Sequence, residues 1–302
     1  MRAYDIISVD MSLKYPVVAS DFDGTLLRSD NKISQYTKEI ITEFVSLGGL
    51  FLVATGRMHQ AIVGRLAEAG LGDLDLPVIS YQGALVKTSI SNRTLIDNSL
   101  DIDIVTDVIN EARARNIYIH GYVDDILYVE RIMPWTTSYV NYLGISFEKV
   151  DDLLEFITQK IRQGHSCHKL LMMMEADQIE IEMKHFLEKF GGGIDYSDPS
   201  QEFKTPPRAV FNTSSVHLLE CVSLNAGKDK AIEQVIKSKG YEMKDVLALG
   251  DSLNDYTMVK RAGMGVAVQN ADARVKSVAK FVTASNDDDG VARAIEKFIL
   301  SR

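Results

Sequence analysis

The sequence predicts an α/β protein with a doubly wound, mostly parallel sheet and an inserted α+β domain. Short apolar runs at 17–20 and 50–54 have the composition and length of strands buried on both faces. Segments with helical spacing of apolar residues alternate with these runs, an order typical of parallel sheets. Half-buried strands and amphipathic helices replace that pattern in the middle of the chain. We therefore expect a core domain formed by residues 1–86 and 205–302 and a cap domain formed by residues 87–204.

The elements of the core follow one another in a regular order. A helix is predicted after Ser34, whose side chain is suited to cap it, and Gly48-Gly49 should end it. The strand at 50–54 leads into a second helix at about 58–69 and a third strand in PVISYQGALV. After the cap, strands are expected in SVHLLECV, DVLALGDSLND and MGVAV, and helices in KDKAIEQVIKSKG, DYTMVKRAG and GVARAIEKFIL.

The middle of the chain has a different pattern. It predicts half-buried strands in DDILYVE and HKLLMMME, and amphipathic helices in DIDIVTDVINEARARN and QIEIEMKHFLEKF. Turn-forming residues at 191–207 indicate the linker that returns to the core. His165, Cys167 and His168 lie close together in sequence, but without a distant pair of ligands they favour a structural role over a metal site.

Composition restricts the class of protein. With 302 residues, 46% of them apolar, the chain is long enough for about two domains with sizeable cores. A net charge of −9 argues against a nucleic-acid-binding face. No apolar run approaches the roughly 18 residues of a membrane span, and the segment before Val17 lacks the apolar stretch of a secretory signal. Cys167 and Cys221 form no CxxC pair. We therefore expect a cytoplasmic protein without disulfides, nucleic-acid partners or membrane partners, either monomeric or a small homo-oligomer.

Acidic residues follow two of the predicted core strands. In PVVASDFDGTLL, Asp21 and Asp23 lie one residue apart and point to the same side of an extended chain. Asp251 and Asp255 follow the strand in DVLALGDSLND. Because ligands of open α/β sheets bind outside the carboxyl ends of the strands, these acids should meet in one crevice. Several carboxylates together require a cation, and oxygen ligands favour Mg²⁺ over Zn²⁺.

The remaining polar residues of the predicted crevice suit a phosphate group. Thr55 offers a hydroxyl, Gly56 an accessible amide, and Lys228 a positive charge. The Gly24-Thr25 pair allows a tight turn that directs amides toward an anion. Together with the acids, these groups indicate a metal-assisted phosphoryl transfer with a carboxylate nucleophile.

Structural explanations exist for the same positions. Thr55 could cap the helix that follows it, and Lys228 could be a solvated residue of a first helical turn. Asp251 and Asp255 could likewise cap a helix start. A lysine at a helix N-terminus opposes the helix dipole, which favours a functional reason for Lys228.

Four motifs in chain order, DFDGTLL, VATGR, NAGKDKAI and GDSLNDYTMV, resemble those of the haloacid dehalogenase (HAD) superfamily. From residue 16 to residue 302, the chain resembles the Cof-type phosphatase branch, subclass IIB. The resemblance implies a Rossmann-like core, a large cap inserted between the second and third motifs, and Mg²⁺-dependent hydrolysis of phosphate monoesters. Gln82 departs from the family pattern, which usually has Asn there. Because it lies near the cap junction, it could affect hinge or substrate contacts.

The resemblance also implies a role for each matching residue. Asp21 would attack phosphorus and become an aspartyl-phosphate, while Asp23 would protonate the leaving oxygen and then deprotonate the hydrolytic water. Mg²⁺ would be held by the Asp21 carboxylate, the Asp23 backbone carbonyl and Asp251. Asp255 would orient these ligands. The groups that would grip the transferring oxygens are Thr55, Lys228, Asn254 and the amides near Phe22 and Gly56.

The resemblance implies a small phosphorylated metabolite as substrate, most commonly a sugar phosphate. The cap would close over the crevice and supply specificity; Trp135, Tyr139 and Tyr142 could line its pocket or pack within the cap. Two alternatives stay open at this point. The protein could be a phosphomutase or phosphotransferase acting on sugar phosphates, or a non-catalytic metabolite-binding protein with the same fold.

Overall fold

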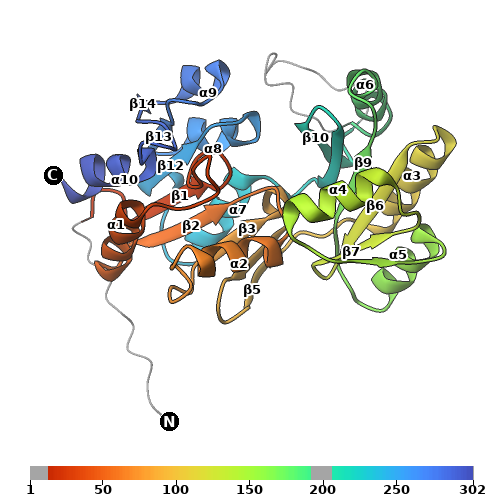
Figure 1. The fold of residues 1–302 in the computed structure, drawn as a ribbon, viewed down its shortest axis with the longest axis horizontal. Helices are drawn as coiled ribbons and strands as arrows, with labels where there is room; N and C mark the ends of the chain where they lie inside the picture. Colours follow the sequence, from red (N-terminus) through yellow and green to blue (C-terminus); the bar gives the residue numbers. More distant parts are fainter. Residues whose placement is uncertain (1–12, 192–205, 302) are drawn as a thin grey trace, which may run out of the picture.

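The computed structural model describes residues 13–191 and 206–301, which form two sheets in separate lobes (Figure 1). The first sheet contains the strands β1 (Val17–Asp21), β2 (Leu50–Ala54), β3 (Pro77–Ser80), β4 (Leu85–Thr88), β5 (Thr94–Asp97), β12 (Val246–Gly250), β13 (Met264–Ala267) and β14 (Phe281–Val282). Their order across the sheet is β14-β13-β12-β1-β2-β3-β4-β5. All neighbours from β14 to β3 are parallel, and only β4 and β5 are antiparallel additions.

Helices cover both faces of this sheet. They are α1 (Gln35–Ser46), α2 (His59–Glu68), α7 (Lys228–Lys237), α8 (Tyr256–Arg261), α9 (Ala273–Val278) and α10 (Gly290–Ile295), which continues as a π-helical segment, η4 (Glu296–Leu300). Successive residues of β1 face opposite sides: Val18 packs with α1 and α10, while Val17 and Ala19 pack with α7 and α8. The Ser34 hydroxyl accepts a hydrogen bond from the Thr37 amide at 3.0 Å, so the predicted cap of α1 is confirmed. The predicted doubly wound fold is confirmed as well.

The second sheet belongs to the other lobe. Its strands are β6 (Tyr118–Val123), β7 (Ile126–Val129), β8 (Phe147–Lys149), β9 (Cys167–Met173), β10 (Ala209–Ser215) and β11 (Leu218–Ser223). Their order is β10-β11-β9-β6-β7-β8, and every pair except β7 and β8 is antiparallel. Three helices, α3 (Ile102–Ala114), α5 (Leu153–Arg162) and α6 (Ile179–Phe190), pack on one face. The other face packs against α4 (Pro134–Leu143) and against Met58 and Tyr81 of the first lobe.

Two strand expectations need correction. PVISYQGALV is not one strand, because Tyr81 and Gln82 have φ angles of +51° and +58° and turn the chain into the β3–β4 hairpin. The strand expected in SVHLLECV is β11, but it pairs with β9 in the second sheet and not in the first. By sheet membership, the first lobe thus extends to Asp97 and the second to Ser223, beyond the 86/87 and 204/205 boundaries expected. The division into a core and a cap stays our proposal.

Other expectations fall on or near the ends of the described ranges. Most of the predicted return linker, residues 192–205, and most of the segment before Val17, residues 1–12, lie outside the described residues. Cys167 is buried and His168 stacks on Tyr81 with ring centroids 5.6 Å apart, as expected for structural residues.

Candidate active site

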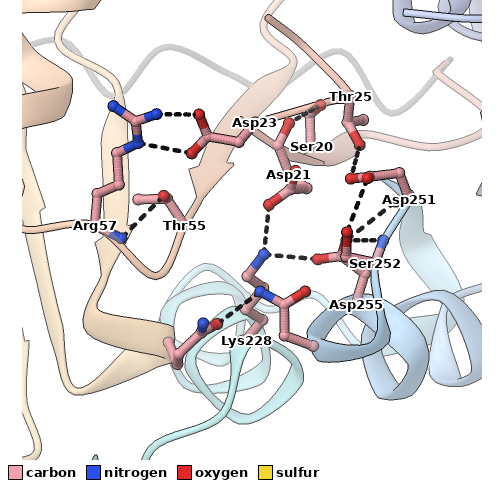
Figure 2. A network of polar contacts seen from close by, with 12 residues as sticks. Ser20, Asp21, Asp23, Thr25, Thr55, Arg57, Lys228, Asp251, Ser252 and Asp255 are labelled. Carbon is pink, nitrogen blue, oxygen red and sulfur yellow. Dashed lines mark hydrogen bonds and ion pairs between the residues drawn. The ribbon is translucent and has the colours of Figure 1, made fainter. Parts of the chain in front are cut away.

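The carboxyl ends of three adjacent parallel strands meet at one edge of the first sheet. Asp21 ends β1, Thr55 follows β2, and Asp251 follows β12. In β1 and β2 the register pairs Asp21 with Ala54, which places the two strand ends side by side. Figure 2 shows Asp21 between Asp23 and Arg57 on one side and Asp251 and Asp255 on the other. The convergence predicted from the separate motifs is therefore present.

A buried lysine connects the centre of this group. Lys228, the first residue of α7, donates hydrogen bonds to Asp21 Oδ1 at 2.5 Å and to Asp255 Oδ1 at 2.6 Å (Figure 2). Burial alone would lower the pKa of Lys228, but the charges of the two carboxylates raise it above its ordinary value. Lys228 is therefore a fixed cation, not a solvated residue of a helical turn.

The carboxylates outnumber that cation. One oxygen from each of Asp21, Asp251 and Asp255 lies within 4.8 Å of the others. Burial and then the charge of Asp255 raise the pKa of Asp21 well above its usual range, although Lys228 opposes this. Burial and Asp255 raise the pKa of Asp251 in the same way. A divalent cation would relieve this repulsion, and three hard oxygen ligands suit Mg²⁺.

Asp255 is fully buried and holds the other acidic residues in place. Its Oδ2 accepts hydrogen bonds from the amides of Asp251 and Ser252, both at 3.0 Å, while its Oδ1 binds Lys228. Asp251 is itself fixed because Thr25 donates to its Oδ1 at 2.9 Å and Ser252 donates to its Oδ2 at 2.8 Å. These contacts suit the orienting role expected for Asp255, although its carboxylate also lies close enough to serve as a ligand.

Asp23 points away from the other acids and is held by Arg57. The guanidinium donates from Nε to Asp23 Oδ2 at 2.8 Å and from Nη2 to Oδ1 at 2.5 Å, a bidentate pair. The Asp23 side chain is 41% exposed, whereas that of Arg57 is 9% exposed. Arg57 was missed in the sequence, although it is the last residue of VATGR and its charge opposite so many acids was a usable signal. The pair fixes the direction of the carboxylate of Asp23.

The Thr55-Gly56 turn forms the next part of the site. The Thr55 hydroxyl is buried and accepts a hydrogen bond from the Arg57 amide at 3.1 Å. A Cβ atom at Gly56 would lie 2.4 Å from Gln82 Nε2, so a side chain there would require Gln82 to move. Gln82 in turn accepts a hydrogen bond on Oε1 from Asn254 Nδ2 at 3.2 Å. Gln82 therefore connects the strand ends of β2 and β12.

The side chain of Phe22 does not line the cavity, so only its backbone could serve the phosphate-binding role expected for it. Its side chain is fully buried in the core between the sheet and α1, and its carbonyl accepts a hydrogen bond from the Leu27 amide at 2.7 Å. This loop brings Gly24, with a φ angle of +76°, against Asp251: a Cβ atom at Gly24 would lie 2.8 Å from Asp251 Oδ2. Only glycine fits this turn without displacing the carboxylate.

A family model described as haloacid dehalogenase-like hydrolase matches residues 18–295 of the chain. The chain belongs to the haloacid dehalogenase-like hydrolase family. This confirms the family predicted from the four motifs, and with it a hydrolase of the HAD type.

Relatives and solved structures agree with this family. The chain is 27% identical to YwtE and 29% identical to YcsE, both 5-amino-6-(5-phospho-D-ribitylamino)uracil phosphatases of Bacillus subtilis. The matches cover 93% and 96% of this chain and 97% and 98% of the two relatives. A haloacid dehalogenase-like hydrolase from Bacteroides thetaiotaomicron superposes with a TM-score of 0.76 at 25% identity, covering 94% of this chain and 99% of that one.

A large cavity opens from the acidic site of this HAD hydrolase toward the second lobe. It measures about 800 Å³. Its floor is formed by Asp21, Asp23, Thr55, Gly56, Arg57, Gln82 and Asn254. Its other wall comes from the second lobe and includes Trp135, Tyr139, Lys169, Met173, His217, Leu218 and Glu220. Trp135 and Tyr139 line the pocket and also pack against an apolar cluster of the second lobe, so both expectations are confirmed for them. The side chain of Tyr142 lies outside the described part.

Two observations bear on the other expectations for this HAD hydrolase. Among the described residues, no helix is both long and apolar enough to cross a lipid bilayer. Within the same residues, the only group of three or more potential metal ligands is the cluster of Asp21, Asp251 and Asp255.

Lys169 and Glu220 were not expected in the site, because a lysine and a glutamate in separate strands carry no recognisable motif.

Proposed function

We propose that this HAD hydrolase is a Mg²⁺-dependent phosphatase of small phosphorylated metabolites. The observation that carries the proposal is the position of Asp21. It is buried at the end of β1, held 2.5 Å from Lys228, grouped with two further carboxylates, and it faces a cavity large enough for a metabolite. A carboxylate placed in this way can act as a nucleophile once the charge of an approaching phosphate is screened.

The chemistry follows from the positions of two carboxylates. Asp21 attacks phosphorus, a bond forms between its carboxylate oxygen and phosphorus, and the bond to the leaving oxygen breaks. Asp23 protonates that oxygen, then removes a proton from a water molecule that attacks the aspartyl-phosphate. Free phosphate leaves and Asp21 is restored. Arg57 keeps the carboxylate of Asp23 directed along one line through both steps.

Lys228 and the Thr55-Gly56 turn serve the transferring group. Lys228 already neutralises part of the charge of Asp21, so a phosphate dianion can approach that carboxylate. The Thr55 hydroxyl, the Asn254 amide and the backbone amides of Phe22 and Gly56 supply donors around the phosphoryl oxygens.

The acidic cluster fits Mg²⁺. The residues that would hold it are Asp21 and Asp251 through their carboxylates and Asp23 through its backbone carbonyl, with Asp255 beside them. When bound, the ion supplies positive charge that stabilises the developing charge on the phosphoryl oxygens.

The substrate class follows from the cavity and the relatives. Phosphate would bind at the acidic floor and the rest of the metabolite would occupy the wall formed by the second lobe. YwtE and YcsE act on a ribityl phosphate that carries a uracil ring, and a sugar phosphate or polyol phosphate of this kind is our candidate.

The test is phosphate release from p-nitrophenyl phosphate with Mg²⁺ and with a chelator. We expect release only with Mg²⁺, and a loss of at least about 10³-fold in kcat for Asp21→Asn. Asp30→Asn is the matched control, because Asp30 is an exposed aspartate whose contacts, an ion pair with Arg28 and a hydrogen bond from the Lys32 amide, lie on the surface. Release that survives in Asp21→Asn, or that does not require a divalent ion, would contradict the proposal. In a second assay with a sugar phosphate as substrate, an isomerised sugar phosphate in place of free phosphate would indicate a mutase.

A further inference from the structure

Two buried charges lie in the wall of the cavity, outside the acidic site. Lys169 is on β9 and Glu220 on the neighbouring strand β11. Lys169 Nζ lies 3.1 Å from Glu220 Oε1, and the two side chains are only 2% and 3% exposed. Both residues line the cavity that opens from Asp21.

This ion pair is a poor device for stability. Removing two charges from water costs several kcal/mol per ion, and apolar residues of similar size usually stabilise a fold as well or better. Burial would lower the pKa of Lys169, but the charge of Glu220 raises it above its ordinary value, so the lysine is charged. A charged pair kept in a cavity wall is better explained by a ligand than by folding.

The pair also lies next to the phosphate end of the cavity. Lys169 Nζ donates a hydrogen bond to the Gly56 carbonyl at 3.1 Å, one residue after Thr55. The ammonium lies 5.1 Å from the centre of the Tyr122 ring and 5.7 Å from that of Tyr81. These contacts hold the ammonium beside the Thr55-Gly56 turn, on the side of the cavity where we propose that the phosphate binds.

Lys169 retains a donor for a ligand. An ammonium has three N–H groups, and the hydrogen bonds to Gly56 and Glu220 account for two of them among the described residues. The Glu220 carboxylate beside it is a strong acceptor. A hydroxyl group both donates and accepts, so one hydroxyl group of a ligand can accept from Lys169 and donate to Glu220.

The rest of the wall has a different character. Trp135 and His217 lie with ring centroids 5.9 Å apart, and Met173 and Leu218 also line the cavity. This part suits a planar or apolar group at the far end of the ligand.

We propose that Lys169 and Glu220 select the leaving group by binding hydroxyl groups on the carbons next to the phosphoester. The substrate class is then a phosphorylated polyol or sugar, whose far end rests on the wall that includes Trp135 and His217. This inference rests on the proposed phosphatase function. Lys169 and Glu220 are specificity residues and take no part in the transfer of the phosphoryl group.

The test compares two probes that differ only in hydroxyl groups, ribitol 5-phosphate and n-pentyl phosphate. The readout is the ratio of their kcat/KM values. Since hydrogen bonds to charged groups are each worth roughly 10- to 100-fold, we expect the wild type to prefer ribitol 5-phosphate by at least about 10-fold. Glu220→Gln and Lys169→Met should each lower that ratio by about 10-fold or more.

Matched controls come from ion pairs of the second lobe that do not line the cavity. Lys189→Met removes a contact with Glu111, and Glu182→Gln weakens the pair with Arg115; both should leave the ratio unchanged. Glu220→Gln preserves the size of the side chain. If Lys169→Met does not fold, the ratio of kcat/KM values for Glu220→Gln alone tests the inference.

The outcomes are distinct. A wild type that hydrolyses both probes equally well, or variants that lower both values in proportion, would overturn this inference and leave the phosphatase function standing. An equal fractional loss of kcat/KM for both probes would mean that Lys169 only holds the second lobe against Gly56. A wild type that releases phosphate from neither probe nor from p-nitrophenyl phosphate would overturn the proposed function together with the inference.

Discussion

Replacing Lys228 by methionine tests the electrostatic account of the site most sharply. The side chain is fully buried, and it is the cation that contacts both Asp21 and Asp255, at 2.5 and 2.6 Å. Methionine keeps much of the volume and removes the charge. Breaking a buried pair by removing one partner costs about 3 to 5 kcal/mol, because the remaining charge is uncompensated. We expect a loss of that size in the free energy of unfolding at about pH 8 without divalent ions.

The destabilisation caused by Lys228→Met should depend on pH. The folded protein holds the pKa of Asp21 well above its ordinary value of 3.8, so the folded state binds a proton more readily than the unfolded chain. Losing Lys228 raises that pKa further. Stability of Lys228→Met should therefore recover as the pH falls, by up to about 1.4 kcal/mol per pH unit for each carboxylate that takes up a proton. The difference in the free energy of unfolding between variant and wild type should therefore become smaller as the pH is lowered from about 8.

Urea denaturation followed by circular dichroism measures both quantities. Lys244→Met is the control, because Lys244 makes a fully exposed ion pair with Glu242 and its loss should leave the midpoint unchanged. A loss below about 1 kcal/mol for Lys228→Met, or a difference from the wild type that does not become smaller at lower pH, would show that Lys228 does not stabilise the acidic cluster.

Three further predictions follow from contacts elsewhere in the molecule. Gly24→Ala should lower the free energy of unfolding by about 1 to 2 kcal/mol and kcat by at least about 10-fold, because the new Cβ displaces Asp251; an unchanged kcat would count against this geometry. Asp125 accepts hydrogen bonds from two amides at the start of α2 and from the Tyr81 hydroxyl, so Asp125→Ala should lower the free energy of unfolding in urea by about 2 to 4 kcal/mol. A loss below about 1 kcal/mol would show that these bonds contribute little to stability. His120 is fully buried, and burial lowers its pKa from 6.5 to about 3. As the pH falls below 6.5, the unfolded chain takes up a proton that the folded state does not, so the free energy of unfolding falls. Relative to His120→Leu, the wild type should lose about 2 kcal/mol between about pH 8 and about pH 5, and parallel pH profiles would contradict this.

Much of the fold was predictable because its signals are local. Uninterrupted apolar runs gave β1, β2 and β12, and Ser34 gave the start of α1. The β3–β4 hairpin was missed because its turn uses Tyr81 and Gln82 at positive φ, and neither residue is a typical turn former. The placement of β11 was missed because an amphipathic strand shows which face it buries, but not which sheet it joins.

The residues of the site were likewise predictable where they belong to local motifs, and not where they depend on contacts between distant segments. Asp21, Thr55, Lys228 and Asp251 belong to motifs with fixed order, and the geometry brings them together. Arg57 could have been predicted as a cation of the site, but its pairing with Asp23 could not, because that bond joins two loops. The Lys169–Glu220 pair depends on the register of β9 and β11 and on the approach of the second lobe to Gly56, which no local pattern specifies. Groups set by strand ends were therefore predictable, and groups set by the contact between lobes were not.

In the proposed mechanism, Asp21 forms a covalent bond to phosphorus. Rapid quenching of the enzyme during turnover of p-nitrophenyl phosphate with Mg²⁺, followed by borohydride reduction and peptide mapping by mass spectrometry, tests it directly. We expect the acyl phosphate to be reduced to homoserine at residue 21 and nowhere else, and only when substrate and Mg²⁺ are both present. Homoserine at Asp23 or Asp251 instead, or steady turnover with every aspartate of the site unmodified, would contradict it.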